Sequence, residues 1–130
     1  VFDLDVCAPE GGTGLVPAKH HYSLKDDGLT SNWFGNVFMN PPFSETGIWA
    51  LKFINHANGI ALLPVSKGKW FGDVWDSAPA IKLLPPKFKF ERPDGERKDV
   101  FMPLVLVAFG EKNINALDRV TGYSTKRHAV

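Results

Sequence analysis

Four consecutive residues, Asn40-Pro41-Pro42-Phe43, bring together groups that suit the recognition of a planar amino group. The Asn40 amide has an oxygen that accepts hydrogen bonds and an NH₂ group that donates them. Each proline lacks an N–H and fixes φ, so the backbone cannot continue directly into a helix or a sheet ladder. The residue before a proline is held out of the α region, which keeps Asn40 extended. The amide, the rigid Pro41 carbonyl and the Phe43 ring would together suit an amino group such as N6 of adenine.

The same four residues have a simpler interpretation as a turn that ends a strand. Pro-Pro pairs are common in loops, and short motifs carry a risk of false matches. Taken alone, the motif leaves both interpretations open, so the elements around it must decide between them.

The motif lies between an expected strand and an expected helix. The apolar run 37–39 precedes it, and Ile48, Leu51 and Ile54 recur after it at helical spacing. Asn40 would therefore stand at the carboxyl end of a strand, where open α/β sheets bind their ligands.

Strand and helix patterns alternate along the rest of the chain. The β-rich residues 1–7 predict a first strand that ends near Asp5, and a glycine-rich loop follows at 9–14. This loop lacks the spacing of a dinucleotide-binding fingerprint, so we interpret it as a linker. The apolar run 60–65 is typical of a buried parallel strand, and 67–78 predicts a second helix. The pattern predicts an α/β fold with a mostly parallel sheet and an antiparallel hairpin at its C-terminal end.

That hairpin is expected to use the last strong strand, 104–109, with 87–91 as its mate. Pro93-Asp94-Gly95 is a turn signal between them. Residues 121–130 are polar, and we expect them to be loosely ordered.

We accordingly expect one domain over residues 1–112 and a polar C-terminal tail over 113–130. The chain begins with a strand-like sequence and no initiator methionine, so we expect some N-terminal sequence to precede it.

Composition bounds the class of protein. With 130 residues, 44% hydrophobic and 22% charged, the chain suits one soluble globular domain. A net charge of +1 provides no global attraction to nucleic acid, so any DNA contact needs a local basic patch. The single cysteine, Cys7, excludes an internal disulfide and fits a reducing cytosol. We expect no membrane span, and no metal, since His20 and His21 would point to opposite faces of a strand.

Several segments, in their order along the chain, resemble the phage and prophage DNA N6-adenine methyltransferase family. The similarity spans about residues 2 to 109. It rests on Phe2-Asp3-Leu4-Asp5-Val6-Cys7-Ala8, Asp27-Gly28-Leu29 with Trp33, Asn40-Pro41-Pro42-Phe43, Trp49, Leu62-Leu63-Pro64, Trp70-Phe71 and Phe88-Lys89-Phe90.

The resemblance implies a Rossmann-like methyltransferase fold and S-adenosylmethionine as the methyl donor. The Asn40 side-chain oxygen and the Pro41 carbonyl would accept hydrogen bonds from the two N–H groups of the target amine. Pro42 would complete the rigid turn, and Phe43 would stack on a flipped-out adenine.

The resemblance also implies a cofactor site at the end of the first strand. Asp5, followed by Cys7 and Ala8, falls where such enzymes contact the methionine part of the cofactor. Asp27 falls where an acidic residue meets the adenosine.

The expected partner is double-stranded DNA, in the cytoplasm of the host if a phage encodes the protein. The densest basic segment runs from Lys82 to Lys98, and in an alternating segment its lysines would face outward. The residues expected to contact DNA from the hairpin are Lys89, Arg92, Arg97 and Lys98. Nearby acidic residues also allow a plain solvated hairpin, and Lys126 with Arg127 form a second basic candidate.

Two rival functions remain open. An Asn-Pro-Pro-aromatic motif also serves other planar nitrogens, which allows a methyltransferase that acts on an RNA base or a protein glutamine. The glycine loop Ala8-Pro9-Glu10-Gly11-Gly12 departs from the Phe-x-Gly-x-Gly pattern of many adenine methyltransferases. This departure favours a catalytically weak DNA-binding remnant, whereas the intact Asn40 to Phe43 motif opposes it.

Overall fold

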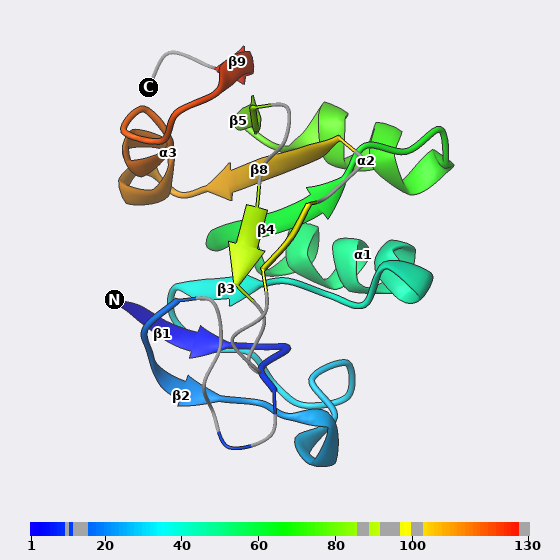
Figure 1. The fold of residues 1–130 in the computed structure, drawn as a ribbon. Helices are drawn as coiled ribbons and strands as arrows, with labels where there is room; N and C mark the ends of the chain where they lie inside the picture. Colours follow the sequence, from blue (N-terminus) through cyan, green and yellow to red (C-terminus); the bar gives the residue numbers. More distant parts are fainter. Residues whose placement is uncertain (10, 12–15, 86–88, 92–96, 100–102, 128–130) are drawn as a thin grey trace.

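The computed structural model describes residues 1–130 except 10, 12–15, 86–88, 92–96, 100–102 and 128–130. Its elements, drawn in Figure 1, are β1 (Phe2–Asp5), β2 (Ala18–His21), η1 (Leu24–Asp26), β3 (Val37–Met39), η2 (Phe43–Glu45), α1 (Thr46–His56), β4 (Gly59–Pro64), α2 (Lys69–Ser77), β5 (Ala80–Leu83), β6 (Lys89–Glu91), β7 (Arg97–Asp99), β8 (Leu104–Phe109), α3 (Glu111–Leu117) and β9 (Tyr123–Arg127).

One seven-stranded sheet, in the order β2-β1-β3-β4-β8-β5-β9, organises the described residues. Its strands follow one another from β2 at the bottom of Figure 1 to β9 at the top. The pairs β1/β2, β1/β3 and β3/β4 are parallel, whereas β4/β8, β5/β8 and β5/β9 are antiparallel. The α/β class is confirmed, but the sheet is mixed, and a mostly parallel arrangement is not confirmed because the later strands pair antiparallel.

The expected pairing of 104–109 with 87–91 is wrong. Strand β8 pairs with β4 and β5, and β6 instead pairs with β7, with Glu91 opposite Arg97. Five of the six β8 residues are buried. A strand that is apolar on both faces belongs in the interior of a sheet, which is the position between β4 and β5.

The expected loose ordering of 121–130 is also wrong for Tyr123–Arg127, which forms β9 and extends the sheet beyond β5. Before it, α3 buries Ile114 and Leu117 against the sheet. The last carbonyls of a helix lack partners within the helix, and here a lysine supplies the donor. Lys82 Nζ donates hydrogen bonds of 2.7 Å to the carbonyls of Leu117 and Val120. Lys82 is therefore buried and does not belong to a surface basic patch.

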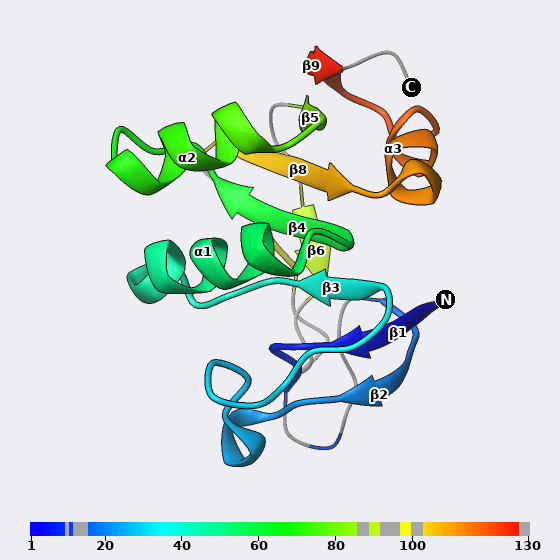
Figure 2. The same cartoon turned by 180° about the vertical axis from the view of Figure 1, so that it is seen from behind.

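Helices cover both faces of the sheet. Alternate strand residues such as Met39 and Leu63 share a core with α1 and α2, through Phe53 and Val74. The intervening residues face α3 and a smaller core on the other side, because successive strand side chains point to opposite faces. Figures 1 and 2 show α1 and α2 next to each other, with α3 apart from them.

Candidate active site

The Asn40 turn leaves the carboxyl end of β3, as the sequence predicts. Asn40 is half-buried, Pro41 is buried, and the Phe43 side chain is 38% exposed. Within the part of the chain that the structure describes, no hydrogen bond engages the Asn40 side chain. Its amide is therefore available to a ligand.

Short backbone bonds fix this turn. Pro42 has φ −61° and ψ 131°, and its carbonyl accepts a hydrogen bond of 3.0 Å from the Glu45 N–H. The buried Thr46, the first residue of α1, donates its hydroxyl to the Phe43 carbonyl at 3.1 Å. These bonds hold Phe43 on the outer side of the turn, one turn ahead of the helix.

Asp5 lies at the same edge of the sheet, at the end of the neighbouring strand. Asp5 stands opposite Phe38 in the parallel pair β1/β3, and the Val6 N–H donates to the Phe38 carbonyl at 3.1 Å. Because parallel strands end at the same edge, Asp5 and Asn40 are presented to the same side of the molecule. Asp5 and Asn40, which the resemblance links to the cofactor and to the target base, thus lie at one edge of the sheet.

The electrostatics at the end of β1 set the charge of its two titratable groups. The Asp5 carboxyl is 2% exposed, and burial raises its pKa, against the opposing effects of the Cys7 N–H bond of 3.2 Å and the charge of His21. Burial, with the negative charges of Asp5 and Glu45, raises the pKa of the Cys7 thiol to about 11. Cys7 is therefore a neutral thiol near pH 7 and not an activated nucleophile.

Ala8 closes the gap between the ends of β1 and β2. It is buried, and its N–H donates to the Tyr22 carbonyl at 2.8 Å. Its role in the backbone is thus structural, and any contact with a cofactor stays a prediction.

The Asp27 turn packs directly onto the end of β1. Gly28 is buried against the Val6 carbonyl, and a Cβ built on Gly28 would lie 2.8 Å from the Trp49 ring. Asp27 is exposed and left-handed, with φ 51°, and its carboxylate accepts a hydrogen bond of 3.2 Å from the Leu29 N–H. The segment thus forms a tight turn, in which the Thr30 and Ser31 N–H groups donate to the Asp27 carbonyl. It also places Asp27 near the strand that carries Asp5.

The predicted DNA contacts lie elsewhere. Lys89 is on β6, Arg97 and Lys98 are on β7, and Arg92 lies outside the described residues. The β6/β7 pair forms a separate two-stranded sheet. The alternative basic candidate Lys126 donates from its Nζ to the Trp75 carbonyl, so it is already engaged.

Sequence reasoning missed Lys52, a half-buried residue of α1. Its Nζ donates to the Gly28 carbonyl at 3.1 Å and to the Leu29 carbonyl at 2.9 Å. The one signal in the sequence is a lysine between the apolar residues Leu51 and Phe53 of this helix, and such a lysine is usually solvated. Its partners could only be found from the structure.

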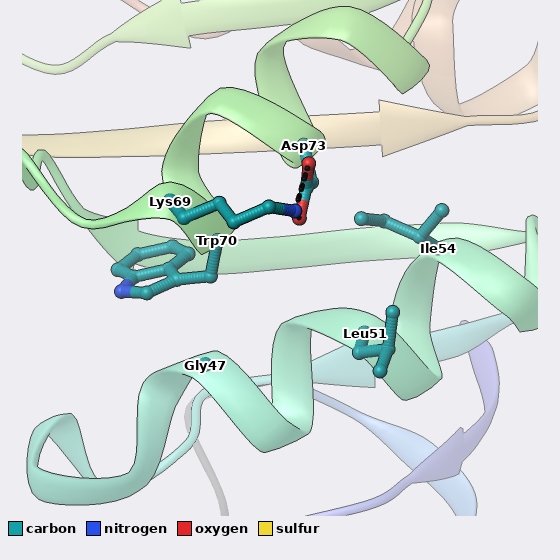
Figure 3. Close-up of a pocket in the computed structure, with 6 residues that line it drawn as sticks. All are labelled: Gly47, Leu51, Ile54, Lys69, Trp70 and Asp73. Atoms are coloured by element: carbon teal, nitrogen blue, oxygen red, sulfur yellow. Dashed lines mark hydrogen bonds and ion pairs between the residues drawn. The ribbon is translucent and has the colours of Figure 1, made fainter.

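Two cavities formed by described residues flank α1. One, of about 240 Å³, lies between α1 and α2, and Figure 3 shows the Trp70 side chain over Gly47 at one end. The other, of about 480 Å³, is open and lies at the far end of α1. The first is lined by Gly47, Leu51, Ile54, Lys69, Trp70 and Asp73, and the second by Asn32, Trp33, Lys52, Asn55 and His56.

The described residues also bear on metal binding and on membrane insertion. They contain no group of three or more His, Cys, Asp or Glu side chains placed to hold a metal ion. None of the helices in this part of the chain is long and apolar enough to cross a membrane.

Comparison with known proteins identifies the family. The model of the DNA N-6-adenine-methyltransferase (Dam) family matches residues 1–98 of the 130-residue chain. This range contains Asp5, Asp27 and the Asn40 turn. The comparison with curated proteins and that with solved structures each returned no match. The chain belongs to the DNA N-6-adenine-methyltransferase family.

Proposed function

We propose that this protein transfers a methyl group from S-adenosylmethionine to N6 of an adenine that is flipped out of double-stranded DNA. Membership of the family supports the reaction class and DNA as the substrate. The observation that carries the proposal is the Asn40 amide at the carboxyl end of β3, which bonds to no other described residue, beside the exposed Phe43 ring.

The residues at the end of β1 fit the proposed cofactor. Among the described residues, only the Cys7 N–H donates to the buried Asp5 carboxylate, whereas an ionised carboxyl group has about four acceptor positions. Burial without a full partner disfavours its charge, so a cationic group such as the methionine ammonium would stabilise it. Trp49 supplies a donor in the same region, because its Nε1 is buried without a hydrogen-bond partner among the described residues.

Each residue then has a defined task. When bound, the cofactor supplies an electrophilic methyl group. The Asn40 oxygen and the Pro41 carbonyl accept hydrogen bonds from the two N–H groups at N6 of adenine. These bonds direct the nitrogen lone pair toward the methyl group without a strong base. Phe43 provides an exposed ring on which the flipped base can stack. Asp5 and Asp27 hold the two ends of the cofactor.

The proposal includes a Rossmann-like arrangement and a DNA-contacting hairpin. The neighbouring parallel strands β2, β1, β3 and β4, in a sheet with α1 and α2 on one face and α3 on the other, support the first. The antiparallel pairing of Glu91 with Arg97 supports a hairpin that carries Lys89, Arg92, Arg97 and Lys98. We expect the reaction to take place in the cytoplasm, within a single methyltransferase domain.

A labelling experiment tests the reaction. Purified protein is incubated with methyl-labelled S-adenosylmethionine and unmethylated plasmid DNA, and the digested nucleosides are separated. N6-methyladenine is expected. Asn40→Ala should remove most of the label and leave cofactor affinity, measured by calorimetry, nearly unchanged. Label in RNA or in protein glutamine, with none in DNA, would refute the DNA substrate.

The hairpin is tested through the salt dependence of DNA binding. Changing Arg92, Arg97 and Lys98 to Ala should weaken binding and flatten the log–log salt slope by about 0.9 for each phosphate that the protein no longer neutralises. Lys112→Ala, which removes an exposed charge of α3, is the matched control. An unaltered slope in the triple variant would place the DNA on another surface.

A further inference from the structure

The Lys52 ammonium group donates all of its hydrogen bonds to one loop, residues 28–31. Besides the Gly28 and Leu29 carbonyls, its Nζ donates to the Ser31 carbonyl at 2.5 Å. An ammonium group has three donors, so these three acceptors use all of them. The Nζ atom also lies 5.2 Å from the centre of the Trp33 ring, within the range of a cation–π contact.

None of the strands that the structure describes pairs with this loop, so side chains supply donors to its carbonyls. Trp33 Nε1 donates to the Gly28 carbonyl at 2.8 Å, and the Trp33 ring stacks on Trp49 with centroids 6.4 Å apart. The Tyr22 hydroxyl donates to the Asn32 carbonyl at 2.6 Å. Buried backbone groups need such partners. Lys52 supplies three of these bonds from a single residue on the rigid helix α1.

The hydrogen bonds from Lys52 to this loop also fix the position of Asp27. Asp27 directly precedes Gly28, whose backbone rests on the Val6 carbonyl just beyond Asp5. Its φ of 51° is uncommon for a residue with a side chain, so the surrounding structure must hold it there. Desolvation lowers the pKa of Lys52 while the Asp27 charge raises it, so the two side chains lie within electrostatic range.

We infer that Lys52 is a positioning residue for cofactor binding, which holds the Asp27 turn over the carboxyl end of β1 so that Asp27 and Asp5 face the cofactor together. This inference rests on the proposed function. Lys52 itself has no free donor for a ligand. It acts through the turn, and its effect on binding should disappear once Asp27 has been removed.

A double-mutant cycle on S-adenosylmethionine affinity tests this role. Lys52→Met keeps the aliphatic stem and removes the charge and all three donors. We expect it to weaken binding roughly tenfold, as does removal of one charge-assisted hydrogen bond. Asp27→Ala should have a similar effect, and the double variant should bind no more weakly than the weaker single variant. Lys67→Met is the control, because Lys67 is exposed and lies outside the loop.

Hydrogen exchange without cofactor gives an independent readout. The Thr30 and Ser31 N–H groups donate to the Asp27 carbonyl at 3.1 and 3.0 Å. Both should exchange faster in Lys52→Met, whereas the amides of β4 and β8 should not change.

Lys52→Arg should retain only part of the wild-type affinity for S-adenosylmethionine, since the planar guanidinium group does not match three converging carbonyls.

The outcomes separate the inference from the proposed function. Wild-type protein that binds no S-adenosylmethionine overturns both. Wild-type binding with unchanged affinity in Lys52→Met overturns the positioning role alone, even if the loop exchanges faster. Decreases in affinity that add in the double variant overturn it too, since they would show that Lys52 acts independently of the Asp27 turn.

Discussion

Gly28 is the position at which a single methyl group tests the packing of the Asp27 turn. In Gly28→Ala the new Cβ would meet the backbone carbonyl of Val6 and come within 2.8 Å of the Trp49 ring. Val6 is fixed in the sheet edge, and Trp49 is 6% exposed. Neither neighbour can move aside, so the turn must lift away from β1.

The expected cost follows from this geometry. Gly28 does not have a left-handed φ, so backbone strain adds nothing and the effect is steric. Overpacking a fixed site costs about 1–3 kcal/mol, and the contact with a backbone atom places Gly28→Ala at the upper end. For a domain of this size each kcal/mol lowers Tm by roughly 3–5 °C.

Gly72→Ala provides the matched control. Gly72 lies within α2, and a Cβ there would have no atom within 4 Å. The same substitution should therefore stabilise the protein by about 0.5–1 kcal/mol, through helix propensity. Urea unfolding followed by circular dichroism measures both variants. If Gly28→Ala unfolds at the wild-type midpoint, the Asp27 turn does not pack on β1 in this way, and the reasoning on Asp27 and Lys52 fails with it.

Two further predictions concern buried charges. Lys82→Met removes the donor to the Val120 carbonyl and one of two donors to the Leu117 carbonyl, at the end of α3, since the Val120 N–H also donates to Leu117. The free energy of unfolding should fall by about 1–3 kcal/mol for the carbonyl left unsatisfied. An unchanged urea midpoint would contradict this, and DNA affinity should not respond. Burial raises the pKa of Asp5, so the folded state binds the carboxyl proton more tightly than the unfolded chain does. In the absence of cofactor, the free energy of unfolding should therefore fall as pH rises from about 4 through the raised pKa. Asp5→Asn should abolish that fall and be the more stable protein at pH 7 by thermal unfolding, while binding S-adenosylmethionine more weakly; an identical pH profile in the variant would assign the effect to another group.

Local signals were sufficient to predict the Asn40 turn. The run Val37–Met39, the two prolines and the apolar spacing of α1 act within a few residues of one another, so β3, the turn and α1 follow from the sequence. The partners of β8 could not be predicted in this way. The apolar sequence of a strand indicates that the strand is buried, but it does not indicate which strands it pairs with.

The positions of two lysines were also hard to predict, because their hydrogen-bond partners are distant in the sequence. Lys82 begins the densest basic segment and is expected at the surface, but its acceptors are carbonyls that lie 35 and 38 residues further along the chain. A lysine such as Lys52 is expected to be solvated, and nothing in the sequence pairs it with the backbone carbonyls of Gly28, Leu29 and Ser31. Both lysines complete the hydrogen bonding of distant backbone, which depends on tertiary structure alone.

The place of β8 between β4 and β5 governs when the sheet can be completed during synthesis. Strands β2, β1, β3 and β4 find their parallel neighbours early, but the remaining edge of β4 pairs with residues 40 to 50 positions further along the chain. Strand β5 leaves the ribosome before either of its partners, β8 and β9. Because unpaired edges invite association with other chains, the nascent protein is most prone to aggregate in the interval between β5 and β8. Slower elongation over that interval, or a shortage of chaperones, should therefore reduce the yield of folded protein without any change in its final stability.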